Sequence, residues 1–155
     1  LIDSDKTLEI EVHKLIEGNL WLVREGLELW ASDKPLKLLL ENHFDKLYKK
    51  KQDERPDLVC RSRDDGRQAV IMEFKRPKVK IKMEHITQAL SYESIIKAHR
   101  PNINFETFIM GREYSPEVMA SKFKLEKGGL YLWSFSELLQ RTRSRFEQIL
   151  EILKK

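Results

Sequence analysis

Cysteine is nearly absent from the sequence, and this scarcity excludes two classes of protein. Cys60 is the one cysteine among 155 residues. An intrachain disulfide framework and a cysteine-based zinc cluster are therefore both excluded. A lone thiol is typical of a reducing compartment, so we expect a cytoplasmic protein.

Long apolar runs are missing as well. No stretch approaches the about 18 consecutive apolar residues of a membrane span, and the N-terminus lacks the basic and apolar regions of a signal peptide. We therefore expect no membrane partner. Because the chain begins at Leu1 rather than at methionine, we also expect that residues 1–155 form a single domain of a longer polypeptide.

Charged residues, in contrast, are abundant. They make up 35% of the chain, and the formal net charge is +4. Hydrophobic residues account for 41%, which is compatible with a globular core and argues against disorder. The small basic excess suits a polyanionic partner such as nucleic acid, although charge alone does not identify one.

Several segments with apolar residues at helical spacing predict helices. Ser32 and Asp33 offer an N-cap for the second helix, and Ser134 with Glu137 forms a capping box for the last. The predicted helices cover residues 7–19, a segment from the Ser32–Asp33 cap to about residue 50, residues 81–99, a short helix beginning at 115–116, and the segment after 134.

Short segments rich in Val, Ile and Leu predict strands between these helices. Residues 55–61 and 68–74 flank the turn residues Asp64, Asp65 and Gly66, which indicates an antiparallel hairpin. Further strands are predicted over 105–110 and 130–133, and the stretch 20–31 is predicted to be extended or hairpin-like. Strands alternate with helices only in the second half, so the predicted fold class is α/β (α+β), a central mixed β-sheet flanked by helices.

The predicted hairpin carries three polar residues that can meet in one cleft. Asp57 stands near the start of one strand and Glu73 near the end of its antiparallel neighbour, so the reversal of the chain brings the two carboxylates together. Alternation along the strand places Lys75 on the same face as Glu73, with Phe74 on the other face. This arrangement suits metal-assisted hydrolysis of a phosphodiester.

The chemistry of these groups defines a predicted metal site. Hard oxygen ligands from Asp57 and Glu73, joined by the carbonyl of Phe74 and by water, suit Mg²⁺ or Mn²⁺. Lys75 can orient or deprotonate the attacking water, or stabilise negative charge on the phosphate. The residue types alone leave these roles of the lysine open.

A basic segment follows directly after Lys75. Arg76, Lys78, Lys80 and Lys82 alternate with apolar residues, so an extended segment would present the four cations on one side. We predict that they contact the phosphate backbone of a nucleic acid. The alternative interpretation is a solvated sheet edge.

Pro56, Asp57, Glu73 and Lys75 together resemble the motif of the PD-(D/E)xK nuclease superfamily. The resemblance implies a restriction-endonuclease-like fold and divalent-metal-dependent cleavage of DNA, with Mg²⁺ or Mn²⁺ as the cofactor. The turn, the strands and the following helix fall where that fold requires them.

The same resemblance implies site residues on two helices. Gln88 and Tyr92 lie four residues apart on one helix face and match the Gln-x-x-x-Tyr pair of many superfamily nucleases, near the metal site or the DNA backbone. The superfamily usually adds a glutamate from its first helix, for which Glu9, Glu11 and Glu17 are available. Glu11 flanks the apolar stripe of that helix, so it is the predicted residue, and Glu17 is the alternative.

A narrower resemblance covers residues 8–96. The segment from Glu11 to Trp21, Ser32 with Asp33, and residues 73–80 look like nuclease domains at the C-terminal ends of larger bacterial proteins. Some of those carry a GHKL-type ATPase domain upstream and are suspected in defence against foreign DNA. The resemblance therefore implies an upstream ATPase domain and a defence role.

Two other classes of protein stay open. One is a nucleic-acid-binding or protein-binding module that keeps the fold but is catalytically silent. The other is a homodimerisation module, suggested by Met83, Ile86 and Leu90 on a second face of the helix over 81–99. For His85 we favour a buried structural histidine, since no second His or Cys lies at ligand spacing.

Overall fold

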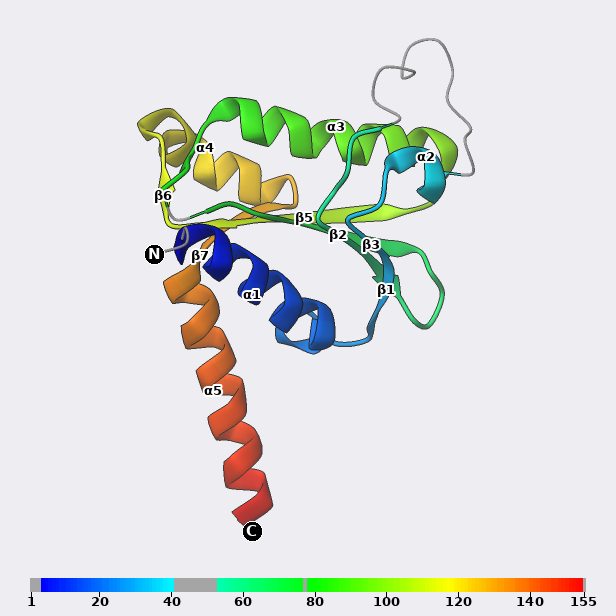
Figure 1. The fold of residues 1–155 in the computed structure, drawn as a ribbon. Helices are drawn as coiled ribbons and strands as arrows, with labels where there is room; N and C mark the ends of the chain where they lie inside the picture. Colours follow the sequence, from blue (N-terminus) through cyan, green and yellow to red (C-terminus); the bar gives the residue numbers. More distant parts are fainter. Residues whose placement is uncertain (1–3, 41–52, 77, 155) are drawn as a thin grey trace.

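The computed structural model describes residues 4–40, 53–76 and 78–154, and its centre is a five-stranded sheet (Figure 1). The strands are β1 (Leu27–Ser32), β2 (Leu58–Ser62), β3 (Gln68–Phe74), β5 (Asn104–Gly111) and β7 (Leu130–Ser134), in the spatial order β1-β2-β3-β5-β7. Strands β1, β2 and β3 pair antiparallel, whereas β3, β5 and β7 pair parallel. The predicted mixed sheet is therefore confirmed.

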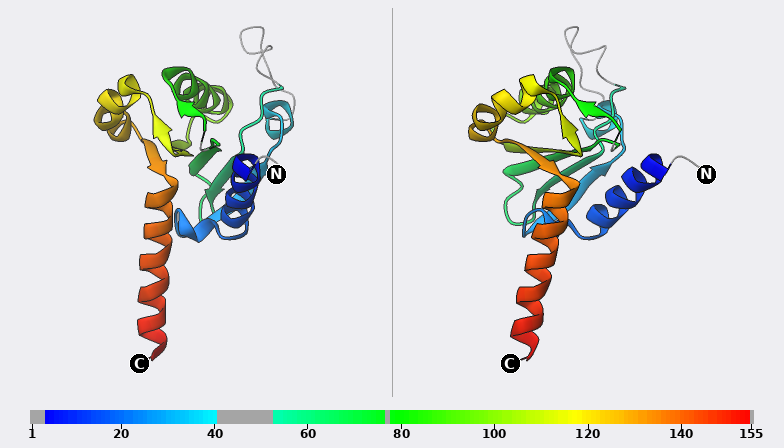
Figure 2. Two further views of the ribbon diagram at one scale, coloured as in Figure 1. Left: turned by 60° about the vertical axis from the view of Figure 1, so that its left-hand side comes forward. Right: turned by 90° about the vertical axis from the view of Figure 1, so that its left-hand side faces the viewer.

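Helices cover both faces of this sheet. They are α1 (Ser4–Gly18), the short 3₁₀ helix η1 (Leu20–Leu22), α2 (Leu36–Leu39), α3 (Met83–His99), α4 (Pro116–Lys127) and α5 (Phe135–Lys154). Figure 1 shows α2, α3 and α4 above the sheet and α1 below it. Helix α5 projects away from the sheet, as the two views of Figure 2 also show. Two further short strands, β4 (Lys80–Ile81) and β6 (Glu113–Tyr114), pair parallel with each other.

The alternation of side chains along β3 separates the core into layers. Val70, Met72 and Phe74 join the cluster that includes Ile16 of α1, whereas Ile71 points to the opposite face, into the cluster built from α2 and α3. Residues one apart on a strand face opposite sides of the sheet. Glu73 therefore shares the α3 face with Ile71.

The predicted hairpin is confirmed, and its turn has a clear local cause. Gly66 adopts a φ of 64°, in the left-handed region that favours glycine. Asp65 accepts hydrogen bonds at Oδ1 from the Ser62 hydroxyl at 2.8 Å and from the Arg67 amide at 2.9 Å. These contacts close the turn and fix the pairing of Leu58 with Met72 at the other end of the hairpin.

Two predicted helix starts are also confirmed. The Ser115 hydroxyl accepts from the Val118 amide at 3.2 Å at the start of α4. At the start of α5, the Glu137 amide donates to the Ser134 hydroxyl at 3.1 Å, and the Ser134 amide donates to Glu137 Oε2 at 3.4 Å. The second pair of bonds is the predicted capping box.

The second predicted helix is wrong at its start. Pro35, rather than Ser32 or Asp33, is the N-cap of α2, which ends at Leu39. Asp33 instead has a φ of 45° and donates its amide to the Asp57 carbonyl at 2.9 Å. This contact with a distant segment overrides local capping, and residues 41–52, over which the helix was predicted to continue, lie outside the described residues.

The stretch 20–31 is a 3₁₀ turn followed by a strand. Strand β1 begins at Leu27 and pairs with β2, with a bulge between Leu29 and Ala31. The hairpin-like alternative is therefore wrong, because the partner strand comes from residues about 30 positions later.

The surface proposed for dimerisation is mostly core. Ile86 is 1% exposed and clusters with Ile109 and Val118, and Met83 packs against the same cluster. Of the three residues, Leu90 alone is exposed. The part of this helix face around Ile86 is therefore covered by α4 and β5, whereas Leu90 stays exposed, and the homodimer stays a prediction.

None of the helices in the described ranges combines the length and the hydropathy of a bilayer-spanning segment.

Candidate active site

The hairpin of β2 and β3 holds Asp57 and Glu73 side by side. The Asp57 amide donates to Glu73 Oε1 at 3.0 Å, and the Phe74 amide donates to Asp57 Oδ2 at 2.7 Å. Each carboxylate is thus anchored by the backbone of the strand that carries the other. The predicted convergence of the two side chains is confirmed.

Lys75 extends the same site toward solvent. Its Nζ lies 3.7 Å from Glu73 Oε2, and its side chain is 21% exposed compared with 7% for Glu73. The Lys75 amide donates to the Met110 carbonyl of β5 at 2.8 Å. This bond continues the β3–β5 ladder beyond the last strand residue and fixes the direction in which the lysine leaves the sheet.

The two carboxylates are crowded in a region of low solvent access. Burial and then the neighbouring charge of Asp57 raise the pKa of Glu73 to about 8, although Lys75 and the Asp57 amide oppose this rise. A nearby cation favours the ionised form of a carboxyl group. A cation bound here would offset the unfavourable ionisation of Glu73, so the site has the electrostatic character of a cation-binding position.

The donor set fits a hard divalent ion. Asp57 and Glu73 provide carboxylate oxygens, which Mg²⁺ and Mn²⁺ prefer over nitrogen or sulfur. In the described ranges, no group of three or more His, Cys, Asp and Glu residues converges as a metal cluster. Further ligands would have to come from a backbone carbonyl such as that of Phe74 and from water, which is usual for Mg²⁺.

A cleft opens directly over these residues. It has a volume of about 330 Å³ and is lined by Asp57, Phe74, Lys75, Arg76, Val79 and His85. Because Asp57 and Lys75 both line it, a substrate entering the cleft would meet a carboxylate and an ammonium group together.

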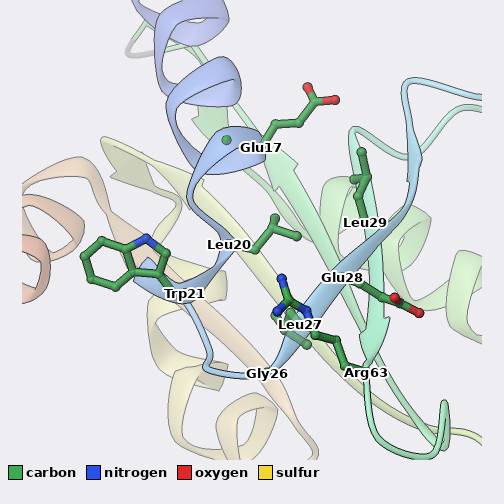
Figure 3. A pocket seen from close by; sticks show the side chains of 9 residues that line it. Glu17, Leu20, Trp21, Gly26, Leu27, Glu28, Leu29 and Arg63 are labelled. Atoms are coloured by element: carbon green, nitrogen blue, oxygen red, sulfur yellow. The ribbon is translucent and has the colours of Figure 1, made fainter.

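A larger hollow of about 450 Å³ lies elsewhere, between the end of α1 and the start of β1 (Figure 3). Its wall includes Trp21, Leu29 and Arg63, but none of Asp57, Glu73 and Lys75. We assign the chemistry to the smaller cleft, because volume alone carries no catalytic group.

The first helix does not bring its predicted glutamate to the cleft. Glu11 is exposed and Glu17 lines the hollow of Figure 3. His13 of α1 instead reaches β3, where its ring stacks on Phe74 with centroids 5.3 Å apart. Its Nε2 lies 3.2 Å from the Ser32 hydroxyl and 3.5 Å from Glu17 Oε2. One feature of the sequence indicated this position of His13: Glu17 follows it by four residues, which places the two side chains on one face of the helix.

The pair on α3 is split between two environments. Tyr92 is 2% exposed and packs against Val59 and Ile71. Burial and the nearby carboxylates of Glu73, Glu54 and Asp57 raise its pKa. The structure therefore places this side chain in the core near the carboxylates, and its contact with nucleic acid stays a prediction. Gln88 is partly buried, and its role stays a prediction.

The basic segment after Lys75 is not continuously extended. The Val79 amide donates to the Arg76 carbonyl at 2.9 Å, which closes a turn before β4 begins. Ile81 is fully buried in the cluster between α3 and α4, and this burial draws the segment onto β6. Arg76 consequently lines the cleft, whereas Lys78 and Lys80 are exposed beyond it.

Comparisons with known proteins agree with this architecture. Neither the protein-family models nor the curated proteins give a match. Among solved structures, a repair endonuclease from Pyrococcus abyssi is similar over 80% of this chain, with a TM-score of 0.55 and 22% identity. A complex of EndoMS with double-stranded DNA is similar over 82%, with a TM-score of 0.54 and 18% identity, and EndoMS in its apo form gives 0.52.

These similarities show that the chain has an endonuclease-like fold. The matched region is only 44–45% of each solved chain, so this chain spans less than half the length of those proteins.

Proposed function

We propose that the protein is a divalent-metal-dependent nuclease that hydrolyses phosphodiester bonds of DNA. The observation that carries the proposal is the mutual anchoring of Asp57 and Glu73, with Lys75 Nζ 3.7 Å from Glu73 at the edge of an open cleft. Glu73 is buried and the adjacent Asp57 is partly buried, and such burial of carboxylates costs stability unless a cation or a proton compensates them. A purely structural hairpin has no need of this arrangement.

Asp57 and Glu73, together with the Phe74 carbonyl, would hold Mg²⁺ or Mn²⁺. The bound ion supplies Lewis acidity and lowers the pKa of a coordinated water. The short bond from the Phe74 amide keeps Asp57 Oδ2 in place, and the Asp57 amide does the same for Glu73 Oε1. The ligands are thus held before substrate arrives, which reduces the reorganisation needed during reaction.

We assign to Lys75 the orientation of the attacking water and the stabilisation of charge on the phosphate. Its ammonium group lies beside the Glu73 carboxylate, and an ammonium group donates hydrogen bonds. Arg76 lines the same cleft and adds a second cation near the phosphate. Gln88 stays in the proposal as a supporting residue on α3.

Double-stranded DNA is the proposed substrate. Support comes from two solved structures with the same fold, one described as a repair endonuclease and one as a complex with double-stranded DNA. The exposed Lys78 and Lys80 beside the cleft would contact the phosphate backbone. A role in defence against foreign DNA, with an ATPase domain upstream, rests on the sequence resemblance.

Cleavage assays with a matched lysine control test the proposal. Plasmid and linear DNA are incubated with wild type, Lys75→Ala and Lys122→Ala in Mg²⁺, in Mn²⁺ and in EDTA. Lys122 also pairs with a glutamate, Glu126 at 3.9 Å, but lies on α4 and not in the cleft. We expect cleavage by wild type and Lys122→Ala only with metal, and a loss of about 100-fold or more in Lys75→Ala.

Equal cleavage by wild type and Lys75→Ala would overturn the assignment of the site. DNA binding without cleavage in either metal would instead favour the catalytically silent binding module.

A further inference from the structure

His85 occupies the wall of the cleft rather than the core. It stands in the first turn of α3, is partly buried, and lines the cleft together with Asp57, Lys75 and Arg76. The sequence predicted a structural histidine, and the proposed nuclease site gives His85 no role. Its position raises the question of what the ring presents to a substrate.

A backbone hydrogen bond fixes the tautomer of this ring. The Lys82 amide donates to His85 Nδ1 at 2.9 Å, so Nδ1 offers its lone pair and cannot carry the proton of a neutral ring. The proton of the neutral imidazole is therefore on Nε2. In the described part of the chain, no hydrogen-bond partner of Nε2 is found.

The surroundings keep the ring neutral. Burial lowers the pKa of His85 and the positive charge of Lys75 lowers it further, whereas Glu84 opposes this and Lys82 adds the smallest lowering effect. At neutral pH the cleft thus contains an uncharged N–H donor beside two cations, Lys75 and Arg76. Such a set matches a phosphate group, whose oxygens only accept hydrogen bonds from donors of this kind.

We propose that His85 is a further catalytic residue, whose Nε2–H donates a hydrogen bond to a non-bridging oxygen of the phosphate that is cleaved. This role rests on the proposed nuclease function, which supplies the reaction. Its geometry comes from the cleft and from the hydrogen bond between the Lys82 amide and His85 Nδ1. A fixed neutral donor stabilises the charge that grows on the phosphate in the transition state and needs no proton transfer of its own.

Two substitutions separate this donor role from the capping role of the ring. In His85→Asn, the side-chain oxygen can take the place of Nδ1 and accept from the Lys82 amide, but nothing replaces the Nε2–H. In His85→Gln, the longer side chain can bring its amide N–H near the position of Nε2. His99→Asn is the matched control, since His99 lies in the last turn of α3, 14 residues or about 21 Å from His85.

Single-turnover cleavage of duplex DNA in Mg²⁺ and thermal unfolding are measured for wild type and the three variants. For His85→Asn we expect a 100- to 1,000-fold slower reaction with a nearly unchanged Tm, and for His85→Gln a partial recovery of rate. His99→Asn should react like wild type. A His85→Asn protein that cleaves at the wild-type rate would overturn the proposal.

A second measurement on wild-type protein does not depend on cleavage or on the folding of a variant. The ¹⁵N resonances of the His85 imidazole are followed by NMR at neutral pH while a short DNA duplex is added in EDTA. We expect an Nε2-protonated ring whose Nε2 resonance moves when DNA binds. An Nδ1-protonated ring, or DNA binding that leaves this resonance in place, would overturn the proposal.

The two experiments also separate the two proposals. If wild type cleaves no DNA in Mg²⁺ or Mn²⁺ but the Nε2 resonance responds to DNA, the nuclease proposal fails while the phosphate contact of His85 stands. If wild type cleaves DNA and the resonance does not respond, the nuclease proposal stands and the contact fails. If wild type neither cleaves DNA with metal nor binds it in EDTA, both proposals fail.

Discussion

Glu73→Gln should make the protein more stable and, at the same time, inactive. The carboxylate is 6% exposed and lies against Asp57, so its ionisation in the fold is costly. Glutamine keeps an oxygen that accepts from the Asp57 amide but carries no charge. We therefore expect a gain of about 1–3 kcal/mol in the free energy of unfolding at neutral pH in EDTA, with loss of metal-dependent cleavage.

The pH dependence of this gain follows from the direction of the pKa shift. The pKa of Glu73 in the fold is about 8, above the usual value of 4.5 for a glutamate. The stabilising contribution of Glu73 is therefore complete below pH 4.5 and is lost as the pH rises through 8. Because glutamine does not titrate, its advantage should be small at pH 4.5, grow through neutrality, and level off above pH 8.

Thermal and urea unfolding of wild type, Glu73→Gln and Glu106→Gln in EDTA between pH 4.5 and 9 measure this gain. Glu106 pairs with Arg24 near the surface, and such a pair contributes about 0–1 kcal/mol, so Glu106→Gln should lose a little stability. For a chain of this length, 1 kcal/mol corresponds to about 2–4 °C in Tm. A Glu73→Gln protein that is less stable than wild type at pH 8 would contradict a costly buried charge at this position.

Three smaller predictions concern the fold around the site. The Cys60 thiol is fully buried, and burial raises its pKa to about 12. A thiol reagent at pH 8 should therefore modify it only in urea, and rapid labelling of the folded protein would contradict this. Gly66→Ala places a side chain at a φ of 64° and should cost about 1–2 kcal/mol in urea unfolding; an unchanged midpoint would be evidence against the left-handed turn. Ser134→Ala removes the hydroxyl that accepts from the Glu137 amide and should lower stability by about 1 kcal/mol, whereas no loss would show that the capping box is unimportant.

The hairpin and its carboxylates were predictable because their causes are local. Turn residues Asp64 to Gly66 lie in the sequence next to the strands that they join, and alternation along a strand assigns Glu73 and Lys75 to one face. Register then follows from the turn. In the structure the Glu73 carboxylate accepts from the Asp57 amide and the Asp57 carboxylate accepts from the Phe74 amide, so the two side chains converge as the strand pattern predicts.

The features that were missed depend on contacts between distant segments. Asp33 was expected to cap a helix, but its amide bonds to the Asp57 carbonyl. Ile86 was expected on a free face, but it packs against Val118 of a later helix. On an amphipathic helix, the hydrophobic pattern identifies the buried stripe. It does not determine how the helix is rotated or at what angle it crosses the element that it packs against.

The same dependence on contacts between distant segments explains why the positions of His13 and His85 were not predicted. His13 reaches Phe74 because of how α1 crosses the sheet, and His85 reaches the cleft because α3 begins just after the buried Ile81. A histidine on a helix has no sequence signature that separates a core position from a cleft wall. The decisive information is the orientation of the helix, which is a tertiary property.

Metal binding and cleavage by Asp57→Asn, measured beside wild type, test the nuclease proposal most directly. Asparagine keeps an oxygen for the Phe74 amide, so the hairpin should persist, as circular dichroism can verify. We expect wild type to bind Mn²⁺ in calorimetry and to cleave DNA, and Asp57→Asn to lose both by about 100-fold or more. Cleavage by wild type in EDTA, or equal Mn²⁺ affinity and cleavage in the two proteins, would contradict a metal site at Asp57 and Glu73.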